Sequence, residues 1–130
     1  MHRAEKLREV ISSLHEANKL VPVIVEGKRD VQALRRLGLS GDIITLHNGK
    51  SIYDFCEDIS ERFSRVILLL DWDSKGEDLN KELSLNLRGH FEEFSPFREL
   101  IKVLCQKDIM QIENIPKLLR RLEDEEADWK

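Results

Sequence analysis

The sequence is poor in the residues that build disulfide scaffolds and loop-rich chains. It has 2 cysteines, 3 prolines and 6 glycines among 130 residues. Two cysteines so far apart, Cys56 and Cys105, exclude a disulfide framework and a four-cysteine zinc site. The apolar fraction of 41% gives a chain of this length enough side chains for one packed core. We therefore expect one globular unit whose two cysteines are ordinary core thiols.

Long apolar runs and an excess of positive charge are also missing. The chain has neither the 18 or so consecutive apolar residues of a membrane-spanning helix nor a signal-peptide pattern, so we expect a soluble, cytoplasmic protein without membrane contacts. Its 21 basic residues are outnumbered by 25 acidic ones, for a formal net charge of −4. This balance argues against a nucleic-acid binder that works through bulk charge, because such domains are usually basic. A local basic site or a metal-bridged site remains compatible with it.

What the sequence does contain is an alternation of short apolar runs with amphipathic stretches. Short β-branched runs bounded by polar residues predict parallel strands at 21–25, 43–46 and 66–70. Apolar residues at helical spacing predict helices over 2–19, 30–37, 51–59, 77–94, 96–105 and 114–125. A short fourth strand is predicted at 109–112. Strands that alternate with helices indicate an α/β fold with a parallel sheet.

Three acidic residues stand where predicted strands end. Glu26 follows the first strand, and Asp71 and Asp73 follow the third. The carboxyl ends of parallel strands share one edge of a sheet, so these side chains converge if the two strands are neighbours. Buried carboxylates are costly unless a cation binds them, and Mg²⁺ prefers oxygen ligands while keeping several waters. The sequence therefore predicts a Mg²⁺ site, open to Mn²⁺ as a substitute, with Glu26 also placed to donate or accept a proton.

The residues beside these acids suit a phosphate. Lys28 and Lys75 each follow an acidic element and supply point charges for phosphate oxygens. Gly27 and Gly76 allow tight turns and a close approach of the backbone. The helix that follows each glycine would add main-chain N–H donors. Trp72, between the two aspartates, is predicted to pack against the sheet edge rather than to stack on a base.

The polar residues near these strand ends have two candidate roles each. Asp30 is expected to cap the start of a helix in preference to binding metal. Asp71 and Asp73 would also serve as helix caps, although that role leaves Glu26 unexplained. Glu77 either adds a carboxylate behind the site or favours a helix N-terminus. His47 follows the second strand and either contacts substrate or has a loop role.

Two of these motifs together resemble the Toprim domain, which bacterial primases, topoisomerases and several nucleases share. They are Val-Ile-Val-Glu-Gly-Lys at 23–28 and, about 40 residues later, Leu-Leu-Asp-Trp-Asp-Ser-Lys-Gly at 69–76. The residues of these two motifs are most similar to those of small stand-alone archaeal Toprim proteins. The resemblance predicts a Toprim domain over 21–115. The apolar spacing and charge outside it predict an amphipathic helix at 1–20 that packs on the domain, and a C-terminal helix with an acidic tail at 116–130.

The resemblance also implies a fold and a chemistry. The fold is a three-layer α/β/α arrangement with a four-stranded, mainly parallel sheet. Glu26 would be the general acid or base, and Asp71 and Asp73 would hold Mg²⁺ with Glu26 near the ion. The implied function is Mg²⁺-dependent phosphoryl transfer on DNA or RNA, as a nuclease or a nucleotidyl-transfer type of enzyme. The alternatives are a non-catalytic module that binds nucleic acid or a protein partner, and chemistry on a small phosphorylated metabolite.

Overall fold

The computed structural model describes residues 2–46 and 49–128. Its strands are β1 (Val23–Val25), β2 (Ile43–Thr45) and β3 (Ile67–Leu68). Its α-helices are α1 (Arg3–Asn18), α2 (Lys28–Arg36), α3 (Ile52–Arg62), α4 (Ser74–Asn86), α5 (Ser95–Cys105) and α6 (Ile115–Ala127). Two 3₁₀ turns, η1 (Glu92–Phe94) and η2 (Ile112–Asn114), precede α5 and α6.

The strands form a parallel sheet with β1 in the middle, in the order β2-β1-β3. Val23 pairs with Ile43 on one side and with Ile67 on the other. One further bond beyond β3, from the N–H of Leu69 to the oxygen of Ile24 at 2.9 Å, continues the pairing toward the carboxyl edge. The first and third predicted strands are therefore neighbours, which is the condition for their terminal acids to meet.

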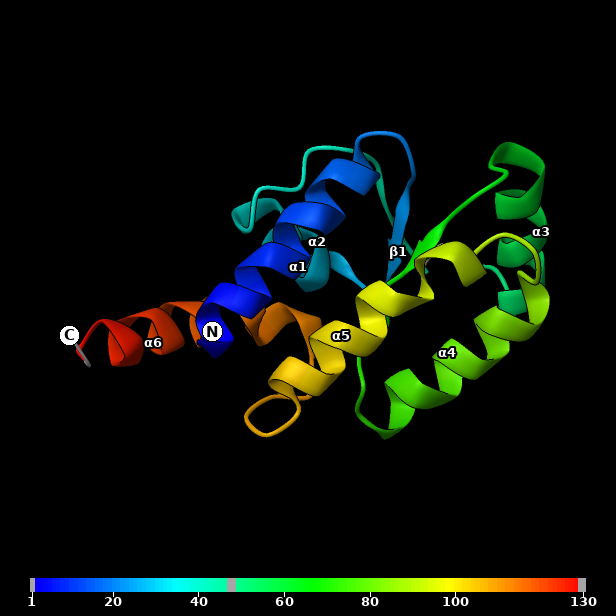
Figure 1. Ribbon diagram of the computed structural model, residues 1–130. Coiled ribbons are helices and arrows are strands. Elements are labelled where there is room, and N and C mark those ends of the chain that lie inside the picture. Colours follow the sequence, from blue (N-terminus) through cyan, green and yellow to red (C-terminus); the bar gives the residue numbers. More distant parts are fainter. Residues whose placement is uncertain (1, 47–48, 129–130) are drawn as a thin grey trace.

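Helices cover both faces of the sheet and give the predicted three layers (Figure 1). Val23 and Val25 face a core built with α1, α2, α5 and α6, whereas Ile24 faces a second core built with α3 and α4. This alternation along one strand is what a sheet buried on both faces requires. Cys56 and Cys105 lie buried, one in each core, as predicted. Within the described residues, every helix is too short or too polar to cross a membrane.

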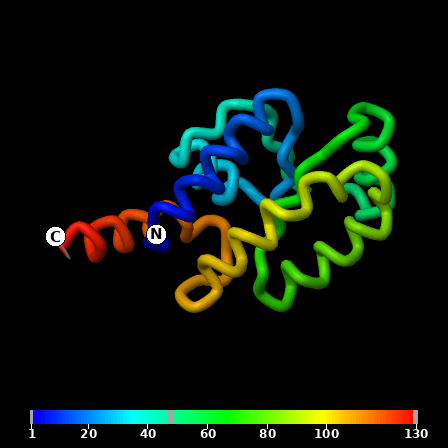
Figure 2. The backbone as a smooth tube through the Cα atoms, viewed as in Figure 1, coloured from blue at the N-terminus to red at the C-terminus, as the bar shows by residue number. Residues whose placement is uncertain are grey.

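The first and last helices, α1 and α6, pack against each other (Figure 2). Near the start of α1, the main-chain N–H of Ala4 donates to the carboxylate of Glu126 on α6 at 3.1 Å. Leu7, Ile11 and Leu14 of α1 enter the same core as Leu118 of α6. The N-terminal helix thus packs on the sheet face through the apolar positions read from its periodicity.

The prediction of a fourth strand at 109–112 is wrong. That segment lies beside the end of β3, but its main-chain groups form isolated hydrogen bonds instead of a regular strand pairing. The oxygens of Ile109 and Met110 accept the indole N–H and the main-chain N–H of Trp72, at 2.8 and 3.0 Å. The N–H of Ile112 donates to the carboxylate of Asp71 at 2.8 Å. Two of these three bonds involve a side chain, so no regular ladder forms, and within the described residues the sheet has three strands.

Two helices, α4 and α2, also differ from the prediction in where they begin or end. The fourth helix spans Ser74–Asn86 rather than 77–94, because Asp73 caps its start and the chain turns at Gly89, which has a φ of +89°. Helix α2 begins at Lys28, so Asp30 is not its N-cap. Asp30 lies in the first turn instead, and its carboxylate accepts the N–H of Gly27 at 3.0 Å.

Candidate metal centre

Glu26, Asp71 and Asp73 meet at the carboxyl edge of the sheet, and we call them the acidic trio. Glu26 directly follows β1, and the two aspartates follow the short extended stretch after β3. One carboxylate oxygen from each residue lies within 4.8 Å of those of the other two. The parallel pairing of β1 with β3 produces this convergence, as the sequence predicted.

Hydrogen bonds from the backbone and from one side chain fix the trio. The main-chain N–H of Asp71 donates to Glu26 Oε2 at 3.1 Å, which joins the two strand ends. Asp73 Oδ1 accepts the N–H of Gly76 at 2.8 Å, and its Oδ2 accepts Gln111 Nε2 at 3.2 Å. Together with the bond from Ile112 to Asp71, these contacts orient both aspartates before any ion arrives.

Burial gives this cluster an unusual protonation. Burial raises the pKa of Asp71 to about 8, and the negative charges of Asp30 and Glu26 add to the rise, while the bond from Ile112 opposes it. Burial also raises the pKa of Asp30, with the charges of Glu26 and Glu113 contributing. Near neutral pH the cluster therefore holds a proton that a cation would displace.

A buried arginine supports the loop that carries the aspartates. Arg98, on α5, is 3% exposed. Its Nε donates to the oxygen of Leu70 at 2.8 Å, and its Nη2 donates to the oxygen of Asp71 and to Glu77 Oε1, both at 2.6 Å. Although burial alone would raise the pKa of Glu77, the bond and charge of Arg98 hold it below its usual value. Glu77 therefore neutralises Arg98 instead of joining the trio.

The two glycines predicted for the site differ in what they permit. A Cβ atom at Gly76 would overlap the main-chain oxygen of Asp71, so the chain can pass there only without a side chain. A Cβ at Gly27 would meet open space among the described atoms. Lys28 and Lys75 are exposed in the first turns of α2 and α4, each two residues from a member of the trio. These placements leave both lysines accessible to a ligand at the sheet edge.

The sequence analysis did not predict two polar residues of the site, Arg98 and Gln111. Arg98 had a readable signal, because it precedes Ile101 and Cys105 by three and seven residues on the buried face of α5. Gln111 had no such signal, because the sequence predicts a strand over its segment. The predicted contact at His47 lies outside the described residues. Trp72 is 4% exposed, which confirms the packed ring and removes it as a base-stacking platform.

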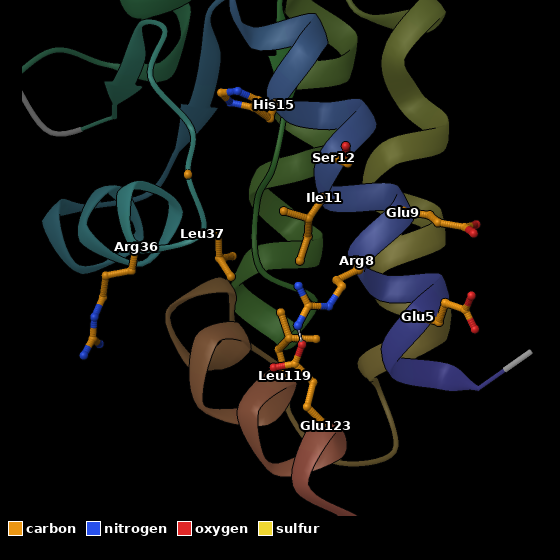
Figure 3. Close-up of a pocket in the computed structure, with 11 residues that line it drawn as sticks. Glu5, Arg8, Glu9, Ile11, Ser12, His15, Arg36, Leu37, Leu119 and Glu123 are labelled. Atoms are coloured by element: carbon orange, nitrogen blue, oxygen red, sulfur yellow. Dashed lines mark ion pairs between the residues drawn. The ribbon is translucent and has the colours of Figure 1, made fainter. Parts of the chain in front are cut away.

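A separate cavity of about 740 Å³ lies between α1, α2 and α6 (Figure 3). In this view Arg8 reaches from α1 to Glu123 on α6, and the two form an ion pair. Glu5, Glu9 and Arg36 point away from the cavity. Its apolar floor includes Ile11, Leu37 and Leu119. Because its inward charges neutralise each other while those of the trio converge, we place the candidate site at the trio.

The trio fits a hard divalent cation. All three donors are carboxylates, and Asp71 is 8% exposed, so its ionised form needs a positive partner. Mg²⁺ and Mn²⁺ favour such oxygen donors, usually with one or two carboxylates and several waters. The chemistry of the donor set thus supports a divalent-metal site, and the choice of Mg²⁺ belongs to the proposal below.

The fold and the site together define a class of protein: an α/β protein whose parallel sheet carries a cluster of carboxylates at the switch point between two strands. Comparison with known families gives the particular one. The Toprim domain matches residues 21–102, which is more than half of the chain, and the chain therefore belongs to the Toprim family. This membership indicates a metal-dependent, nucleic-acid-related function.

Individual relatives agree with this assignment. A UPF0292 protein of Methanosarcina barkeri is 32% identical over 126 residues, covering 92% of this chain and 85% of that protein. A UPF0292 protein of Thermococcus sibiricus is 34% identical over 120 residues, covering 90% of each. A solved structure described as a putative protein from Aquifex aeolicus has a TM-score of 0.67 at 31% identity, over 82% of this chain and 95% of that one. The predicted likeness to small archaeal proteins is confirmed.

Proposed function

We propose that this protein is a Mg²⁺-dependent phosphoryl-transfer enzyme that acts on nucleic acid, with phosphodiester hydrolysis as its reaction. The observation that carries the proposal is the convergence of three carboxylate oxygens within 4.8 Å at the sheet edge. Membership of the Toprim family supports nucleic acid as the substrate class. Exposed lysines beside the trio supply charges for the phosphate.

Each residue has a role that follows from its placement. Asp71 and Asp73 would hold the ion, and Glu26 would lie beside it. The bound ion would stabilise negative charge on the phosphate and the leaving oxygen. Glu26 accepts the N–H of Asp71 through Oε2, which orients its carboxylate and leaves Oε1 to accept or donate a proton. Lys28 and Lys75 would bind the non-bridging oxygens and fix the substrate.

The test is cleavage of labelled DNA and RNA oligonucleotides with Mg²⁺ or Mn²⁺. We expect Asp71→Asn and Asp73→Asn to lower the rate by at least about 100-fold, since each removes a charged ligand. Asp42→Asn is the matched control, because Asp42 is exposed and precedes β2 at the opposite edge of the sheet. Activity that survives both site variants would show that the trio does not carry the reaction.

A binding module without turnover is the second candidate. The observation in its favour is that both aspartates already accept hydrogen bonds from Ile112, Gly76 and Gln111, which holds the site in one arrangement. This candidate predicts Mg²⁺-dependent binding of nucleic acid with no cleavage of any substrate in the panel. Single-turnover assays at high protein concentration separate the two, because slow chemistry still yields product there.

A further inference from the structure

Helix α6 carries its charges in the order opposite to the one that a helix favours. Its first two turns hold Lys117, Arg120 and Arg121, whereas acidic residues occupy 123–126. The helix dipole stabilises acidic side chains at the start of a helix and basic side chains at its end. The charge order of α6 is therefore unfavourable for the helix by itself.

The acidic half of α6 has a partner within the fold. Glu126 accepts the main-chain N–H of Ala4, at the N-terminus of α1, where a negative charge is favourable. Glu123 forms its ion pair with Arg8, also on α1. Docking of α1 thus accounts for these acids.

The basic half is paired only in part. Arg121 Nη2 forms an ion pair with Asp108 Oδ1 at 2.7 Å. Lys117 and Arg120 are exposed and have no ion pair within residues 2–46 and 49–128. Two cations therefore remain for a negatively charged ligand.

These cations border a cleft of about 440 Å³ between the 109–114 segment and α6, which we call the α6 cleft. Lys117, Arg120 and Arg121 line it together with Asn114, and Asp124 contributes a carboxylate. Arg121 is paired with Asp108 and Glu125, so Lys117 and Arg120 face the single carboxylate of Asp124, and the cleft keeps a positive balance although the whole chain carries −4. Such a local positive region is complementary to a polyanion.

Hydrogen bonds connect the α6 cleft to the acidic trio. Gln111 Nε2 donates to Asp73, and Gln111 Oε1 accepts Asn114 Nδ2 at 3.4 Å. Asn114 lines the cleft and directly precedes α6. Two side chains thus bridge the distance between a candidate metal ligand and the first basic turns of α6.

We propose that the α6 cleft binds the phosphodiester backbone of the nucleic acid whose reacting phosphate lies at the trio. The proposal rests on the function proposed above and adds the path that the strand takes away from the site. Helix α6 lies beyond residues 21–102, so this surface is outside the part of the chain that matches the Toprim family model. Lys117 and Arg120 contact phosphate oxygens without reading the base sequence.

The test measures binding of an oligonucleotide of about 12 nucleotides, within the usual range of single-strand site sizes, as a function of salt. The variant is Lys117→Gln with Arg120→Gln. The matched control is Lys81→Gln with Arg88→Gln, which removes the same charge from another hollow, of about 510 Å³. Arg88 lies near His90, whose oxygen accepts the N–H of Val66 just before β3, at the sheet edge opposite the trio.

We expect the α6 variant to weaken binding about equally for all sequences and to lower the slope of log affinity against log salt by about 1 for each lysine or arginine removed. The control should bind like the wild type. The wild type should also bind the oligonucleotide more tightly than a mononucleotide, and the α6 variant should lose most of that difference. Circular dichroism spectra should be unchanged, because the substituted side chains are exposed.

The outcomes separate the two proposals. If the wild type binds nucleic acid and the α6 variant binds equally well, this inference is overturned and the proposed function stands. If both variant pairs weaken binding equally, the effect is bulk charge and the inference is likewise overturned. If the wild type binds no nucleic acid with or without Mg²⁺, the proposed substrate class is wrong and the inference falls with it.

A single substitution sharpens the test further. Lys117 is the third residue of α6, where glutamate is a favoured helix residue. Lys117→Glu should therefore keep or raise the melting temperature while it weakens binding more than Lys117→Gln does. A variant that is at least as stable as the wild type but binds less well cannot be explained by damage to the fold. Unchanged binding by Lys117→Glu would contradict the proposal.

Discussion

The guanidinium of Arg98 donates to the main-chain oxygen of Asp71 at 2.6 Å, so a buried cation holds the backbone of a candidate metal ligand. The same guanidinium bonds Leu70 and pairs with Glu77, which is partly exposed. The carboxylate of Glu77, on the solvent side, thus neutralises the guanidinium, while the N–H groups on the protein side donate to the two main-chain oxygens. This arrangement links α5 to the strand end and resists movement of the loop that carries the trio.

Replacing Arg98 tests this support directly. Arg98→Met leaves the oxygens of Leu70 and Asp71 buried without their donor, and a lost partner of this kind costs about 1–3 kcal/mol. We expect urea denaturation to show a loss of about 2–4 kcal/mol in the free energy of unfolding. Arg98→Lys should lose less, because a single ammonium group replaces part of the fork.

The control for this prediction is Arg88→Met, since Arg88 is exposed and distant from the trio. It should change the free energy of unfolding by no more than about 0.5 kcal/mol. Manganese affinity should fall about tenfold in Arg98→Lys and stay constant in the control. Equal stability of Arg98→Met and the wild type would show that the buried contacts contribute nothing in solution.

The two glycines of the site provide a second, matched comparison. Gly76→Ala places a Cβ atom against the main-chain oxygen of Asp71, and backbone cannot yield as a flexible side chain does. We expect a loss of about 2 kcal/mol or more and weaker metal binding. Gly27→Ala meets open space at a φ of −155° and should cost less than about 1 kcal/mol. Thermal unfolding of both variants checks this, and an equal loss at the two positions would contradict it.

The sequence predicted the strands and their convergence because both depend on local patterns. A buried run such as 66–70 is recognisable by itself, and parallel topology then places its end beside Glu26. The supporting contacts were not predictable in this way. Arg98 reaches an oxygen 28 residues away, and Ile112 reaches a carboxylate 41 residues away. The helical spacing of α5 indicates that Arg98 faces the core, but no periodic pattern indicates which distant groups Arg98 and Ile112 contact.

The pH dependence of stability should run opposite to that of most carboxylates. An aspartate in an unfolded chain has a pKa of about 3.9, whereas that of Asp71 in the fold is about 8. Between these values the folded protein keeps a proton that the unfolded chain has lost. The free energy of unfolding therefore falls as pH rises through this window, by up to about 1.4 kcal/mol per pH unit.

Urea denaturation of the metal-free protein near pH 6 and pH 9 measures this effect, and stability should be lower at about pH 9. Asp71→Asn is neutral at every pH and should remove most of the difference. Asp42→Asn, at the other edge of the sheet, should leave it in place. A metal-free protein that is equally stable at both pH values would show that Asp71 is not the group that holds the proton.

Metal binding should release a proton, because the ion and the proton compete for Asp71. Below about pH 8 the metal-free site carries that proton, and a bound cation favours the ionised carboxylate. Calorimetric titration with Mn²⁺ in buffers of different ionisation enthalpy should give close to one proton released at about pH 6.5 and almost none at about pH 9. Affinity should rise with pH over the same range.

Asp73→Asn should weaken binding yet still release the proton, whereas Asp71→Asn should bind weakly without release. Tight binding at about pH 6.5 with no proton released would mean that Asp71 is already ionised and that no proton competes with the ion in this cluster.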